Sequence, residues 1–194
     1  MSIRSSIPCT KDSAASLIVR RQVKEFIACV RQKRNRAVCF SAYISLLSTI
    51  GDHQYMAALF DTIVKKSSIP SSELSTILAE QLSRQILERK FDTCESILRL
   101  PLQSLRIPLP SYELTQFIRG NSDTDQVCRC LSILIERNLR HDKDYVSWML
   151  ITLFTNYVKG REQIIEHVLK LAKHVSLTQT CFGRSEERRV GKEC

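Results

Sequence analysis

Apolar residues recur every three or four positions through most of this chain, which is the spacing of amphipathic helices. The pattern predicts four successive helix pairs, at 38–50 with 53–66, 72–88 with 91–100, 112–120 with 124–138, and 143–158 with 161–175. Turn signals separate these ranges, among them Gly51-Asp52, Pro70, Pro110 and Gly160. No segment alternates apolar and polar residues convincingly over five positions, as a half-buried strand would. We therefore expect an all-α protein.

The helix pairs follow one another at intervals of about 35 residues, which is typical of a helical-hairpin solenoid. Each pair of such an array buries its apolar face against the next pair. We expect a right-handed α-solenoid of about four antiparallel pairs over residues 37–183. One further helix is predicted from about Ser13 as its N-cap, with apolar residues on a single face. These are Val19, Val23, Phe26 and Val30.

Residues 1–36 carry most of the positive charge. The whole chain has 29 Lys and Arg, 20 Asp and Glu, and a formal net charge of +9, whereas residues 1–36 hold nine basic and two acidic side chains. The rest of the chain is therefore nearly neutral. The Ser- and Arg-rich start is compatible with a mitochondrial transit peptide and equally with the first helix of the array. The run RQKRNR at 31–36 also fits a nuclear or nucleic-acid signal.

The last eleven residues, 184–194, read RSEERRVGKEC. They resemble the in-frame translation of a common sequencing adapter, and the alternative is a natural disordered basic tail. We expect an artefactual, disordered segment here, and a protein that continues differently after about Gly183. Such segments are excluded from fold reasoning.

Residues 38–71, VCFSAYISLLSTIGDHQYMAALFDTIVKKSSIPS, resemble a pentatricopeptide repeat. The matching features are the Val38-x-Phe40 opening, Gly51 between the helices, Leu59-Phe60 in the second helix and the ending Ile69-Pro70-Ser71. The other three units share the period but few of these motif residues. Tetratricopeptide arrays have a similar period, but their small residue at the helix crossing is not visible here.

The resemblance implies a protein that binds single-stranded RNA, one base per repeat, in organelle RNA processing, stability or translation. In this family, a residue near the start of the first helix and the last residue of the repeat contact the base. The matching positions are Ser41 and Ser71 and, in the degenerate units, Ser147 and Asp142. Basic side chains of the first segment are candidates for phosphate contacts, namely Arg20, Arg21, Arg31, Lys33, Arg34 and Arg36.

The alternative is a scaffold for protein–protein interaction, in which the same serines cap helices and line a solvated groove. The nearly neutral charge of residues 37–183 favours this alternative, because phosphate contacts require basic groups.

The chain offers little for catalysis. Its five glycines leave little room for a phosphate-binding loop, and its four histidines, His53, His141, His167 and His174, are scattered. Cys128 and Cys130 are two apart on a predicted helix, so their side chains point to different faces. We expect no enzymatic activity, no metal or cofactor and no small-molecule substrate.

The composition also bears on location. The eight cysteines fall mostly in apolar stretches, and no secretory leader is evident. This indicates a reducing compartment, mitochondrial or otherwise cytoplasmic or nuclear, and not secretion. No apolar run approaches the roughly 18 residues of a membrane span.

Overall fold

The computed structural model describes residues 9–100, 105–139, 142–155 and 162–174. These ranges contain α1 (Lys11–Val19), α2 (Val23–Arg31), the 3-10 turn η1 (Lys33–Asn35), α3 (Arg36–Leu47), α4 (His53–Lys66), α5 (Ser71–Leu87), α6 (Phe91–Leu98), α7 (Ser111–Gly120), α8 (Thr124–Leu139), α9 (Lys143–Thr155) and α10 (Glu162–His174). No strand occurs in the described ranges, so the prediction of an all-α fold is confirmed. Residues 184–194, the expected artefactual tail, lie outside them.

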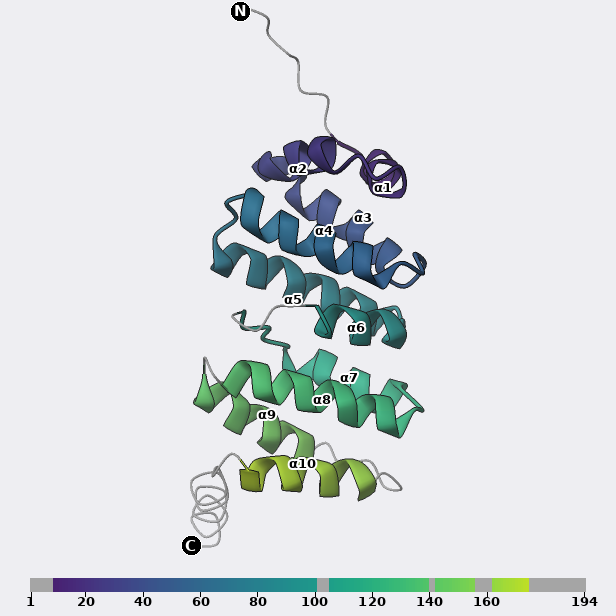
Figure 1. Cartoon of the computed structure of the whole chain (residues 1–194). Helices are drawn as coiled ribbons and strands as arrows, with labels where there is room; N and C mark the ends of the chain where they lie inside the picture. Colours follow the sequence, from purple (N-terminus) through teal and green to yellow (C-terminus); the bar gives the residue numbers. More distant parts are fainter. Residues whose placement is uncertain (1–8, 101–104, 140–141, 156–161, 175–194) are drawn as a thin grey trace, which may run out of the picture. The chain divides into compact units, whose positions relative to one another are not determined.

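The helices, which Figure 1 labels in chain order, group into two compact units. Unit 1 takes in Met1–Gln85 and Asp92–Leu105, and unit 2 takes in Ile86–Phe91 and Arg106–Cys194. Unit 1 therefore contains α1 to α4 and most of α5 and α6. Unit 2 contains α7 to α10.

In unit 1, α1 packs against α3 and α2 packs against α4, in addition to the contacts of α2 with α1 and α3. Tyr43 and Phe60 lie at the centre of the core, with no exposed surface and with their ring centroids 5.9 Å apart. The Tyr43 hydroxyl donates a hydrogen bond to the Met56 carbonyl oxygen (2.9 Å), which satisfies its one buried polar group. The apolar faces predicted for 38–50 and 53–66 are both buried, through Phe40, Ile44, Leu47, Met56, Leu59, Phe60 and Ile63.

The prediction of one N-terminal helix capped by Ser13 is wrong, since α1 and α2 are separate helices. Thr10 caps α1: its hydroxyl accepts from the Ser13 N–H (3.2 Å), and the Ser13 hydroxyl accepts from the Thr10 N–H (3.0 Å). Arg21 adopts a left-handed backbone (φ 56°), which a helix of L-residues does not continue through. Val19 is consequently 61% exposed and does not share a buried face with Phe26.

In unit 2, α7 packs against α9 and α8 packs against α10, while α9 also contacts α8 and α10. Phe91 and Phe117 meet edge to face with ring centroids 5.6 Å apart.

A non-helical segment of unit 2, Arg106 to Leu109, is held by side chains of α8 and α9. The Asn138 amide donates to the Ile107 carbonyl oxygen (3.0 Å) and accepts from the Ile107 N–H (3.1 Å). The Tyr145 hydroxyl accepts from the Leu109 N–H (2.6 Å) and donates to the Leu109 carbonyl oxygen (3.0 Å). Since Ile107 is fully buried, these bonds replace the secondary structure that its backbone lacks.

None of the helices in the described residues combines the length and the apolar character needed to cross a bilayer.

Candidate nucleic-acid interface

Contacts between helices bring the residues around 31–36 together with Ser71 at one end of unit 1. The Arg31 guanidinium donates to the Lys66 carbonyl oxygen through Nε (3.1 Å) and Nη2 (3.0 Å), which joins the last turns of α2 and α4. Arg36 Nη1 lies 2.6 Å from Glu73 Oε2, which joins the first turns of α3 and α5. We call this the basic end of unit 1. It consists of Arg31, Lys33, Arg34, Arg36, Lys65, Lys66, Ser71 and Glu73.

In Figure 1, the α3–α4 and α4–α5 connections lie at opposite ends of α4. The basic end lies where α4 connects to α5. Lys65 and Lys66 did not figure among the predicted phosphate contacts, because only the folding of α4 against α2 brings them to Arg31.

The cations of the basic end differ in what they can offer to a ligand. Arg36 is half-buried, donates from Nε to the Val30 carbonyl oxygen (3.2 Å) and pairs with Glu73, so it has a structural role. Arg31 caps the C-terminus of α4, where its positive charge also interacts favourably with the negative end of the helix dipole. Lys65 is exposed and pairs with Asp61 Oδ2 at 2.6 Å. Lys33, Arg34 and Lys66 are exposed side chains that a phosphate can reach.

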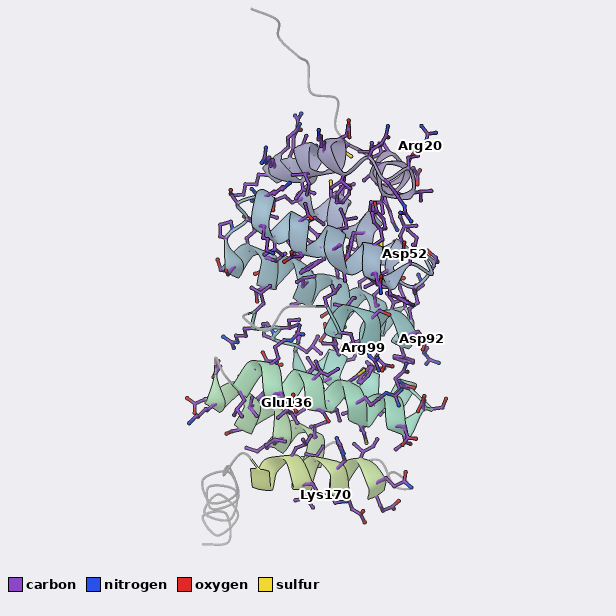
Figure 2. All side chains as sticks on the ribbon, in the orientation of Figure 1. Arg20, Asp52, Asp92, Arg99, Glu136 and Lys170 are labelled. Carbon is purple, nitrogen blue, oxygen red and sulfur yellow. The ribbon has the colours of Figure 1, made fainter. Side chains whose placement is uncertain are left out.

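The remaining predicted phosphate contacts, Arg20 and Arg21, lie at the other end of α2. That helix of nine residues is about 13 Å long. Arg21 Nη2 pairs with Asp52 Oδ2 at 2.9 Å, and the guanidinium carbon sits 4.8 Å from the centre of the Tyr55 ring. Figure 2 shows Arg20 and Asp52 on the same side of unit 1. The basic run of the sequence is thus divided between two ends of the unit.

The predicted base-contacting residues of unit 1 occupy different places on two helices. Ser71 is exposed and is the first residue of α5. Ser41 is half-buried in α3, five residues after Arg36, and its carbonyl oxygen accepts from the Ser45 hydroxyl (2.8 Å). Ser71 therefore lies in the basic end, and Ser41 lies more than one turn into the helix that begins there.

The two predicted residues of unit 2 have local structural roles. Asp142 precedes α9; its Oδ1 accepts from the Tyr145 N–H (2.8 Å), and its Oδ2 pairs with Arg106 Nη2 (2.8 Å). The half-buried Ser147 donates its hydroxyl proton to the Lys143 carbonyl oxygen (2.9 Å). Both carboxylate oxygens of Asp142 are already engaged, which leaves it poorly placed to recognise a base.

A histidine side chain contacts a serine hydroxyl in unit 2. His167 Nε2 lies 2.7 Å from Ser132 Oγ, and Ser132 donates its own proton to the Cys128 carbonyl oxygen (3.0 Å). The tautomer of His167 decides whether its Nε2 donates to the Ser132 hydroxyl or accepts from it. Among the residues that the structure describes, no group of three or more metal-binding side chains is assembled.

In comparisons with known proteins, no family model, curated protein or solved structure matches this chain.

Proposed function

We propose that this chain is a non-enzymatic helical-repeat protein of the pentatricopeptide type that binds single-stranded RNA at the basic end of unit 1. The observation that carries this proposal is the convergence of Ser71, a base-contacting position by resemblance, with the exposed cations Lys33, Arg34 and Lys66. A role in RNA processing, stability or translation within mitochondria would fit both the resemblance and the basic first segment.

The packing within each unit supports a solenoid. Each of four helices packs against the helix two places further along the chain, in the pairs α1/α3, α2/α4, α7/α9 and α8/α10. Equivalent helices of neighbouring hairpins pack side by side in this way when hairpins stack into an array. The first helices of successive hairpins, α3 and α5, then present their N-terminal turns to one ligand.

The electrostatics of this end predict weak and salt-sensitive binding. The cations Lys33, Arg34 and Lys66 can engage about three phosphates, and each contact with a single strand contributes about −0.7 to the slope of log K against log salt. Arg36 does not add to this number, because Glu73 neutralises it.

A second candidate function is a protein-binding scaffold, which the exposed apolar surface of unit 2 favours. Trp148 and Ile151 on α9 are 39% and 41% exposed, and Tyr112 on the adjacent α7 is 61% exposed. Aromatic residues are enriched in protein interfaces.

A titration of the full chain with a labelled, unstructured RNA and with a duplex of the same sequence separates the two functions. RNA binding predicts a single-strand preference at low salt that weakens sharply at moderate salt. Ser71→Ala should alter the base preference, and Trp148→Ala should leave the affinity unchanged. An absence of binding even at low salt, where charges are least screened, would contradict RNA binding and leave the protein-binding scaffold as the remaining candidate function.

A further inference from the structure

The connection between α4 and α5 carries two adjacent serines in opposite situations. Ser67 is buried, and its hydroxyl donates to the Ile63 carbonyl oxygen in the last turn of α4. Ser68 is exposed, and none of the described residues shares a hydrogen bond with its hydroxyl. The fold therefore presents one of the two hydroxyls to solvent and keeps the other engaged.

The charge pattern before Ser68 occurs once in the chain. Lys65 and Lys66 stand three and two positions before it, and the apolar Ile69 follows it. Ser68 is the only Ser or Thr of the sequence with Lys or Arg at both of those positions. Protein kinases select their substrates partly by such charge patterns, because an acidic substrate cleft attracts basic side chains and repels acidic ones. The pattern fits a serine/threonine kinase of this basophilic class.

The backbone around Ser68 can open into the extended form that fits a kinase cleft. Residues 67–70 form no helix, and Ser68 adopts a left-handed conformation (φ 52°). This conformation is unfavourable for a residue with a Cβ atom, so an extended backbone relieves it. Lys65 and Lys66 are the last two residues of α4, and a helix end opens more easily than the middle of a helix. The exposed hydroxyl and both lysines can therefore reach a kinase together.

We propose that Ser68 is a phosphorylation site for a basophilic protein kinase, with the magnesium complex of ATP as the phosphate donor. The Ser68 hydroxyl oxygen attacks the γ-phosphorus of ATP, the bond from this phosphorus to the β,γ-bridging oxygen breaks, and ADP leaves with that oxygen. The Ser68 proton passes to the aspartate base of the kinase and from there to solvent. One serine and one ATP thus give one phosphoserine, one ADP and one proton.

The phosphate would stand in the basic end of unit 1, so its effect on RNA binding rests on the proposed function. A phosphoserine carries a charge of about −1.5 to −2 at neutral pH. Lys66 lies two residues before Ser68, and Arg31 donates to the Lys66 carbonyl oxygen. A phosphate that pairs with neighbouring cations cancels about two of the charges that an RNA strand would otherwise contact. Phosphorylation is therefore expected to weaken RNA binding at this end.

Phosphopeptide mapping tests the site on the full chain without RNA. The protein is incubated with magnesium, ATP and the catalytic subunit of cyclic-AMP-dependent protein kinase, and is then digested with trypsin. Peptide 67–84 contains Ser68 together with five other serines, so fragmentation in the mass spectrometer locates the phosphate. We expect it on Ser68. Ser68→Ala should abolish the modification, and Ser72→Ala, at an exposed serine of α5, should leave its yield unchanged.

Phosphate on a different serine, or a chain that stays unmodified, would overturn the site. The effect on RNA is measured separately, with an unstructured single-stranded RNA over a series of salt concentrations. Phosphorylation should make the slope of log K against log salt shallower by about 1.4, and Ser68→Ala, treated in the same way, should keep its slope. An unchanged slope after phosphorylation would refute the effect on RNA binding. No binding by the untreated chain would contradict the proposed function, whereas the phosphopeptide result stands by itself.

Discussion

The Asn138 amide is one of two side chains whose hydrogen bonds hold the non-helical segment of unit 2, and its removal has a predictable cost. In Asn138→Ala, the Ile107 N–H and carbonyl oxygen both lose their partner in a site where Ile107 and Asn138 have no exposed surface. Each stranded buried group costs roughly 1–3 kcal/mol, so we expect a loss of about 3–5 kcal/mol in the free energy of unfolding. The Leu134 carbonyl oxygen also loses the Asn138 amide as a donor, but Leu134 lies inside α8, where backbone hydrogen bonds of the helix remain.

The chain provides a reporter for this measurement. Its single tryptophan, Trp148, lies in α9 of unit 2, so its fluorescence follows the unfolding of that unit in urea. The matched control is Gln163→Ala, which removes an exposed amide from α10 of the same unit and should change stability by less than about 0.5 kcal/mol. A loss below about 1 kcal/mol for Asn138→Ala would refute the argument that these bonds hold the segment.

Three further predictions concern the core and the titrating groups. Phe60→Ala should destabilise the protein by about 3–5 kcal/mol in chemical unfolding, as a large-to-small change at a fully buried site. Tyr145→Phe should cost about 1–2 kcal/mol through its two bonds to Leu109, whereas Tyr112→Phe, at an exposed ring, should cost nothing measurable. The free energy of unfolding should fall as the pH rises above about 8.5, because thiols of the unfolded chain lose their protons there. In the folded chain, burial raises the pKa of Cys29 to about 11 and also raises the pKa of Cys39, so both thiols keep their protons. Urea midpoints across this range should fall less steeply for Cys39→Ala.

Most helix boundaries could be predicted because their signals are local. The predicted range 53–66 coincides with α4, where Asp52 accepts from the Tyr55 N–H as the N-cap (2.9 Å). Pro70 and Pro110 stand immediately before α5 and α7, where a missing N–H donor costs nothing. The break between α1 and α2 was not predictable in this way, because the apolar spacing continues across Arg21 and only its backbone conformation ends the helix.

The candidate interface could be predicted only in part, because ion pairs between distant residues engage some of the cations. Arg36 pairs with Glu73 and Arg21 pairs with Asp52, and neither partner is marked by its place in the sequence. The number of basic residues in 1–36 therefore overstates the charge that this segment can offer to a phosphate backbone. Conversely, Lys66 joins the basic end only because its carbonyl oxygen accepts from Arg31.

The most direct test of RNA binding at the basic end compares two double variants that remove the same charge. Lys33→Ala with Arg34→Ala removes exposed cations of the basic end, and Arg20→Ala with Lys24→Ala removes exposed cations from the opposite end of α2. The measurement is the affinity of each full chain for an unstructured single-stranded RNA over a series of salt concentrations. We predict that the first variant weakens binding and makes the slope of log K against log salt shallower by about 0.7 for each phosphate that the protein no longer neutralises. The second variant should keep the slope of the original chain. Equal weakening in both variants, or unchanged affinity in both, would contradict an interface at the basic end of unit 1.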